Sequence, residues 1–301
     1  MKIIFFIVIL FLLQITNAKA GTDISKNVEN FNKEISQAAK TEEPYRSNYI
    51  KQRYAANFQG ISITPLDDVE LRMLFIASLN ASSLSRDTHL AKEVRAIFEE
   101  MSSRQILSEQ NYQHMQGLYV RLRLLDDAKF FNEKYQNFAE LEPIPDIRDH
   151  GLKPLGRTVF KIAQNKNQID EVPFQTGNDF FILVIAHPLC HFTQDAAAAI
   201  SSDPALRDFF SAHSKWVVPD DFKFNLPEIR QWNLVFPEYQ LSIVNSVSDW
   251  SEIKYWDTPN FYIYDQGKVI NVIRGWPKDG HLQELRALIK QRTNMQQKGG
   301  T

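Results

Sequence analysis

The sequence predicts a chain of two structural parts, an all-α module followed by an α/β domain. Apolar residues recur with the 3.6-residue period of amphipathic helices from Thr64 to about residue 138. A proline-marked break at Leu141–Asp146 ends this pattern, and short β-rich apolar runs follow it. The expected divisions are a signal peptide at 1–20, a polar arm at 21–60, a helical domain at 61–142, a linker at 143–154, an α/β domain at 155–292 and a tail at 293–301.

The start of the chain has the three parts of a secretory signal peptide. Lys2 is followed by eleven unbroken apolar residues, Ile3 to Leu13, and the stretch ends in Ala18-Lys19-Ala20. A helix needs ~20 apolar residues to cross a bilayer, and no other stretch of the chain is long and apolar enough to do so. We therefore expect cleavage after Ala20 and a periplasmic or secreted protein without a membrane span. An uncleaved anchor is the alternative.

Residues 21–60 contain few large apolar side chains, and their helical periodicity is weak. This pattern predicts a loosely held arm or an irregular helix. The formal net charge of the chain is −2, so it lacks the basic excess that nucleic acids or anionic membranes attract. We expect neither as a partner.

Four helices in two hairpins, at about 65–102 and 107–138, are expected in the helical domain. Thr64-Pro65-Leu66-Asp67 resembles a capping box with proline at the first helical position. The second hairpin resembles a tetratricopeptide repeat, which implies a protein-binding role; plain structural packing is the alternative. It departs from that family at Gln116 and Arg123, where small residues are usual. The matching packing positions are Met115, Tyr119, Ala128 and Phe131.

Short strands and helices alternate in the α/β domain. The strand signals are continuous apolar or β-branched runs, and the helix signals are amphipathic segments that begin at polar or proline residues. The expected strands are Arg157–Ile162 (a strand or half of a hairpin), 179–186, Lys215–Val218, Gln240–Val244, Asn260–Asp265 and Val269–Arg274, and the expected helices begin at Cys190, Asp203 and His281.

Cys190 is the only cysteine of the chain. A buried apolar strand leads into it, and Gln194 to Ile200 behind it are almost all helix formers. A cysteine at the first turn of a helix lies at the positive end of the helix dipole, which stabilises the thiolate. Secreted proteins usually pair their cysteines, and this one has no second cysteine for an internal disulfide. The pattern therefore indicates thiol chemistry.

The order of elements resembles a thioredoxin-like domain over roughly residues 155–292. The resemblance depends on the cysteine that heads the first helix, on Thr258-Pro259 before the terminal hairpin, and on Gly275-Trp276-Pro277 after it. It implies that Pro259 is a cis-proline facing the cysteine and that the backbone of Thr258 pairs with an extended peptide. Trp256 is then expected to line the substrate groove.

Redox members of that family carry Cys-x-x-Cys, whereas this chain reads Cys190-His191-Phe192-Thr193. Leu189 also stands where a tryptophan commonly precedes the motif. Without a resolving cysteine, Cys190 can form a mixed disulfide but needs a second thiol from the substrate, from glutathione or from a partner protein to release it. Thr193 is expected to donate a hydrogen bond to the thiolate, and a protonated His191 to lower its pKa.

Other interpretations of this segment stay open. A non-catalytic binding or assembly scaffold would hold Cys190 as a buried neutral thiol. Copper or zinc bound by His187, Cys190 and His191, with His213 as a fourth ligand, is a further alternative, as is a degenerate c-type haem motif. A one-cysteine peroxidase would want serine or threonine at position 187. No cofactor is expected for thiol exchange itself, and Pro219-Asp220-Asp221 is interpreted as a solvated loop.

Overall fold

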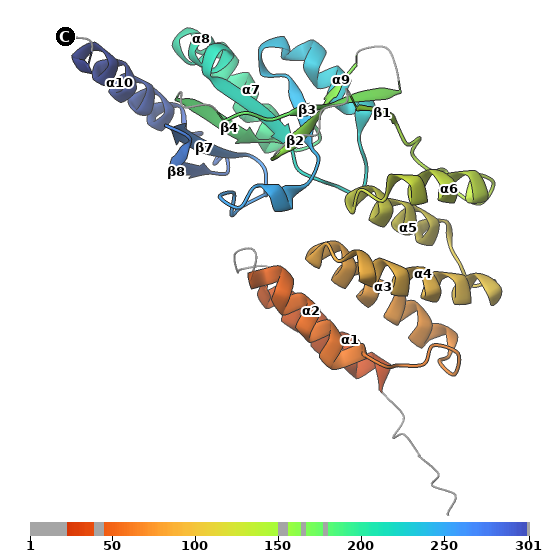
Figure 1. The fold of residues 1–301 in the computed structure, drawn as a ribbon. Coiled ribbons are helices and arrows are strands. Elements are labelled where there is room, and N and C mark those ends of the chain that lie inside the picture. The colour runs from red at the N-terminus through yellow and green to blue at the C-terminus, as the bar shows by residue number, and fades with distance from the viewer. Residues whose placement is uncertain (1–22, 39–44, 150–155, 164–166, 177–179, 300–301) are drawn as a thin grey trace, which may run out of the picture.

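The computed structural model describes residues 23–38, 45–149, 156–163, 167–176 and 180–299. The predicted signal peptide at 1–20 lies outside these residues. The described N-terminal half is helical, and the C-terminal half is a mixed sheet with helices packed against it (Figure 1). This confirms the predicted division into an all-α and an α/β part. No described helix is long and apolar enough to cross a membrane.

Residues 21–60 were expected to form a loosely held arm or an irregular helix, and their described part is more regular than either. They hold two regular helices, α1 (Ile24–Ala38) and α2 (Tyr45–Phe58). The two helices share a buried aromatic contact, in which the Phe31 ring lies 5.6 Å from that of Phe58 and 5.9 Å from that of Tyr54. A few large rings at helical spacing are thus enough to bury one face of each helix.

The four predicted helices are α3 (Asp68–Ser85), α4 (Thr88–Ser103), α5 (Glu109–Arg121) and α6 (Leu125–Tyr135). The predicted cap of the first is misplaced by three residues. Asp67 is the N-cap of α3, because its carboxylate accepts the backbone N–H of Glu70 at 2.9 Å while Glu70 accepts that of Asp67 at 3.0 Å.

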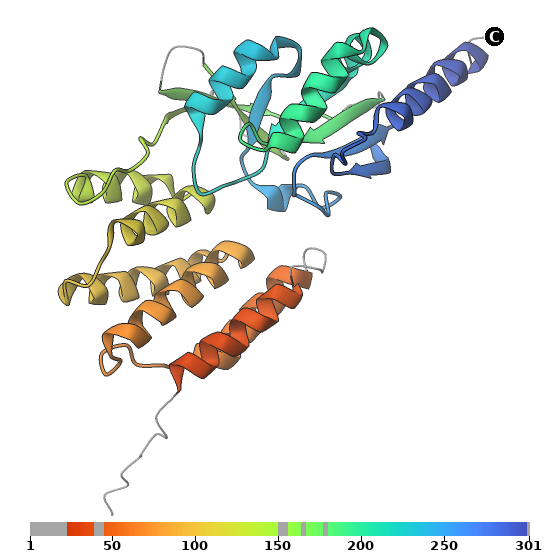
Figure 2. The same cartoon turned by 180° about the vertical axis from the view of Figure 1, so that it is seen from behind.

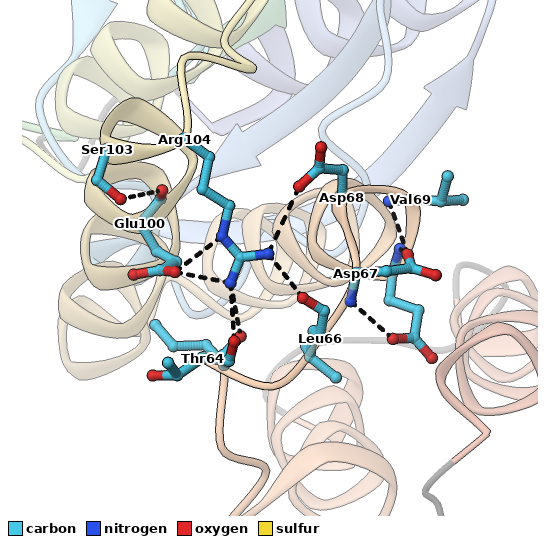
Figure 3. Close-up of polar contacts among 10 residues, drawn as sticks. Thr64, Leu66, Asp67, Asp68, Val69, Glu100, Ser103 and Arg104 are labelled. Carbon is cyan, nitrogen blue, oxygen red and sulfur yellow. Dashed lines mark hydrogen bonds and ion pairs between the residues drawn. The ribbon is translucent and has the colours of Figure 1, made fainter.

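Arg104 explains why Thr64 lies outside the helix. This arginine follows α4, and its guanidinium donates to the carbonyl oxygens of Thr64 at 3.0 Å and Leu66 at 2.6 Å (Figure 3). It also donates to the Glu100 carboxylate, at 2.7 Å. The loop before α3 is therefore held in a non-helical conformation, with its carbonyls turned toward the end of α4.

The helical hairpins stack in one direction. The first helices α1, α3 and α5 pack on one another in sequence, and the second helices α2 and α4 each pack on the first helix of the next hairpin. This is the packing expected of a helical-repeat array, in which each hairpin buries its apolar face against its neighbours. The first two hairpins therefore each complete their core against the hairpin that follows.

The sheet has the strand order β1-β3-β2-β6-β5-β4-β7-β8. Strands β4, β5 and β6 are parallel, whereas β7 is antiparallel to β4 and β8 to β7. Two strands were not predicted: β1 lies inside the expected linker at 143–154, and β3 is polar along most of its length. The strands are β1 (Asp146–Asp149), β2 (Thr158–Ile162), β3 (Gln168–Pro173), β4 (Phe181–Ile185), β5 (Ser214–Val218), β6 (Leu241–Val244), β7 (Asn260–Asp265) and β8 (Lys268–Arg274).

Four helices belong to this half: α7 (His191–Ser202), α8 (Pro204–His213), α9 (Leu226–Val235) and α10 (Leu282–Gly299). Helix α9 was not predicted, and α10 runs through most of the expected tail. Alternate residues of β4 separate two cores. Ile182 and Val184 join a large cluster that includes all four helices and continues into the helical module. Leu183 and Ile185 join a smaller cluster with Trp250 from the segment between β6 and β7.

Candidate thiol site

Cys190 is the N-cap of α7. Its backbone is extended (φ −85°, ψ 114°), and its carbonyl accepts the N–H of Gln194 at 3.1 Å, the first bond of the helix. The Cys190 N–H donates to the His187 carbonyl at 3.0 Å, which closes a tight turn after β4. The side chain is partly exposed. The predicted placement of the cysteine at the start of a helix is confirmed.

The register of the sheet places Thr258 and Pro259 beside Cys190. Because β4 and β7 are antiparallel, Ile185 at the end of β4 pairs with Asn260 at the start of β7. Residues after one strand and before the other therefore meet at one edge. The Thr258–Pro259 peptide is cis, and the Cys190 thiol donates to the Thr258 carbonyl across a distance of 3.4 Å. The predicted cis-proline facing the cysteine is confirmed.

The environment lowers the pKa of Cys190. Burial raises this pKa, but hydrogen bonds from the side-chain hydroxyls of Thr258 and Thr193 and from the backbone N–H groups of Thr193 and Phe192 outweigh that cost. The Thr258 carbonyl accepts from the neutral thiol only, so the contribution of Thr258 to the thiolate comes from its side-chain hydroxyl. The Thr193 side chain is fully buried, which fixes its hydroxyl beside the sulfur. The N-terminal dipole of α7 acts in the same direction.

The remaining predicted site residues lie around this centre. His191 is exposed, and its ring lies against that of Phe192, tilted by 38° with the centroids 3.8 Å apart. Trp256 is partly buried and packs edge-on against Trp250 at 6.0 Å, as part of the smaller core. The structure thus gathers Cys190, Thr193, Thr258 and Pro259, with His191 on the solvent side and Trp256 packed against the sheet.

Two aspartates that sequence reasoning treated as solvated belong to the site's surroundings. Asp220 is 5% exposed, and Arg86 donates two hydrogen bonds of 2.9 Å to its carboxylate. Asp221 Oδ2 lies 3.5 Å from Nε2 of His187. The solvated-loop interpretation is wrong for Asp220, because the end of β5 abuts the helical module, whereas the Asp221 side chain is 41% exposed. The available signal was a pair of aspartates that follows the expected strand Lys215–Val218 after one proline.

The described residues offer no group of three or more His, Cys, Asp or Glu side chains close enough to hold a metal ion. His213, the suggested fourth ligand, ends α8 and packs on the Phe209 ring at 4.7 Å. The metal interpretation therefore gains no support from the geometry.

Comparisons with known proteins leave the site to be judged on its own geometry. No family model, curated protein or solved structure matches this chain.

Proposed function

We propose that this protein carries out thiol–disulfide exchange through Cys190, on a thioredoxin-like domain. The strand order β5-β4-β7-β8, with the cysteine directly after β4, supports the fold assignment. One observation carries the function: the sulfur lies at the N-terminus of α7 and 3.4 Å from the carbonyl that precedes a cis-proline. This arrangement supplies a stabilised thiolate next to backbone that an extended peptide can join.

The exchange takes place in two balanced steps. The Cys190 thiol loses its proton to solvent, and the thiolate attacks a substrate disulfide R–S–S–R′. A Cys190–S–S–R bond forms as the substrate bond breaks, and R′S⁻ leaves. An external thiolate R″S⁻ then attacks this mixed disulfide, which yields R–S–S–R″ and returns the Cys190 thiolate. One substrate disulfide is replaced by another, so no net oxidation takes place.

Protein thiols and disulfides are the favoured substrates, with low-molecular-weight thiols able to release the intermediate. Leu189 and Phe192 flank the cysteine, and their side chains are 61% and 46% exposed. Large exposed apolar side chains beside a nucleophile suit an apolar polypeptide segment. In this proposal the protein works in a periplasmic or secreted compartment, and its helical module selects or presents a protein partner.

The decisive experiment is the pH dependence of Cys190 alkylation by iodoacetamide, with Cys190→Ser as the blank. A midpoint well below ~8.5, with fast labelling of the folded protein, is the expected result. The same sample should release one equivalent of thiol from an aromatic disulfide reagent and retain a mixed disulfide. Labelling that stays slow until the protein is unfolded would identify a buried thiol and favour the non-catalytic scaffold.

A further inference from the structure

We propose that His187 and Asp221 are positioning residues for Cys190, and that the helical module holds this pair in place through Asp220. The inference rests on the proposed function, because it assigns the groups that set the reactivity of the same sulfur. It makes the helical module a structural part of the thiol site, in addition to any role in partner selection.

His187 holds the turn that presents the cysteine. Its Nδ1 accepts the N–H of Leu189 at 3.2 Å, and its carbonyl accepts the N–H of Cys190 at 3.0 Å. Its own N–H points to the buried hydroxyl of Thr193 at 3.5 Å. His187 therefore connects the backbone of Leu189 and Cys190, directly before α7, with the Thr193 hydroxyl. Rotating this imidazole away would free the N–H of Leu189 and loosen the N-cap.

Asp221 fixes the orientation of that imidazole. Since Nδ1 accepts a hydrogen bond, the ring hydrogen of a neutral His187 lies on Nε2. This nitrogen is buried, no described group forms a hydrogen bond of good geometry with it, and Asp221 Oδ2, on a side chain that is 41% exposed, lies 3.5 Å away. A carboxylate behind an imidazole selects its tautomer and its rotamer. His187 also lowers the pKa of Asp221, which keeps this carboxylate charged.

The helical module determines where Asp221 lies. Its neighbour Asp220 accepts two hydrogen bonds from Arg86, at the C-terminal end of α3. Arg121 of α5 donates to the Asp220 carbonyl at 3.3 Å, and its guanidinium lies over the ring of Phe222 at 5.2 Å. In Figure 2 the teal segment that leads from β5 into α9 reaches down to the helical module at this point.

Neutralising Asp221 should change the pKa of the Cys190 thiol in opposite directions, depending on whether Asp221 acts through its charge or by holding the turn. Its negative charge by itself raises the pKa of a nearby thiol, so neutralising it would lower that pKa. If the carboxylate instead holds the turn, neutralising it disorders the donors that face the sulfur, and the pKa rises. The charged or titratable groups on the elements around Cys190 are His187, His191, Asp195, Asp220, Asp221, Asp257, Arg86, Arg121 and Arg274.

The test compares Asp221→Asn with Asp257→Asn. Asp257 precedes Thr258 and pairs with Arg274 at 3.5 Å, so its removal deletes a charge near the site without touching His187. We expect Asp221→Asn to raise the alkylation midpoint by about half a unit to one unit, which slows labelling at pH values below the midpoint about three- to tenfold. Asp257→Asn should leave the midpoint unchanged or slightly lower. An unchanged or lower midpoint in Asp221→Asn would overturn the inference.

A second pair of variants decides the question if Asp221→Asn folds poorly. His187→Asn retains a side-chain acceptor for the N–H two residues on, whereas His187→Ala removes it. The alanine variant should have a higher alkylation midpoint than the unmodified protein. The asparagine variant should have a midpoint close to that of the unmodified protein. Equal midpoints in the two variants would contradict a positioning role.

Hydrogen exchange separates this inference from the proposed function. Exchange of the His187, Leu189 and Cys190 amides should be faster in Asp221→Asn and in Arg86→Gln than in Asp257→Asn, whether or not the thiol is reactive. Unchanged protection in Arg86→Gln would show that the helical module does not hold the turn. An ordinary alkylation midpoint in the unmodified protein, together with faster exchange in these variants, would instead overturn the redox function alone.

Discussion

Thr193 occupies the position of the missing resolving cysteine, and its hydroxyl should tune the sulfur that remains. Thr193→Val keeps the shape of this fully buried side chain but removes its only hydrogen-bond donor. The hydroxyl contributes to the lowered pKa of Cys190, and it also lies 3.5 Å from the N–H of His187. We therefore expect the substitution to raise the pKa of the thiol while the fold persists.

The expected size of the effect follows from the exposure of the sulfur. A hydrogen bond to a charged group contributes about 1.5–3 kcal/mol when water is excluded. Cys190 is only partly buried, so water replaces part of the lost bond and about 1 kcal/mol is a better estimate. At 1.36 kcal/mol for each pKa unit, this corresponds to a rise of about 0.7 unit. Alkylation below the midpoint should then be about fivefold slower.

Iodoacetamide labelling rates between pH 5 and pH 9, fitted for the midpoint, measure this shift directly. Thr193→Ser is the matched control, because it retains the hydroxyl and loses only a methyl group. The serine variant should therefore keep the original midpoint even if it is less stable. If the valine and serine variants titrate together, the Thr193 hydroxyl does not reach the thiolate and this account of the site is wrong.

Two further predictions concern the junction between the helical module and the sheet domain. Gly117→Ala should destabilise the protein by about 1–3 kcal/mol in urea unfolding, although alanine favours helices, because its Cβ would lie 2.8 Å from Cδ1 of Phe222; an increase in stability would contradict this packing. Burial raises the pKa of Asp220, but its bonds to Arg86 outweigh that effect and leave it lowered. The ion pair therefore stabilises the fold above the unfolded pKa of ~3.9 and is lost as the pH falls through the folded value. The stability difference between the unmodified protein and Arg86→Gln should shrink between pH 7 and pH 3, and a constant difference would refute the pairing.

Sequence reasoning predicted the elements that have a continuous apolar run or a regular apolar stripe. Strand β4 is a continuous apolar run, and α3 to α6 carry regular apolar stripes, so their type follows from periodicity. Strand β3 was not predicted, because Ile169 is its only fully buried residue and Pro173 ends it. Helices α1 and α2 were not predicted as regular helices because each buries only a few side chains, aliphatic as well as aromatic, in a stretch that is otherwise polar.

The candidate site divides in the same way. Cys190 and the Thr258–Pro259 pair could be placed because sequence order and the thioredoxin-like resemblance predict which strand ends meet. The ion pair between Asp220 and Arg86 could not be predicted, since the two residues are 134 positions apart and lie in different modules. Pairing of this kind depends on how the two modules dock, which no local pattern encodes.

The junction behind the cysteine turn is built to hold one orientation. Burial lowers the pKa of Arg121, and that of Arg123 to about 10, so both guanidinium groups carry a desolvation cost. Arg123 offsets it by donating to the carbonyls of Val244 and Asn245, at 2.8 Å each. Sliding the modules past each other would leave these buried donors unpaired, at a cost of about 1–3 kcal/mol for each one. Because Asp221 follows directly from this junction, a substitution at Asp221 should disturb the thiol more than one at Asp257, which has no connection to it.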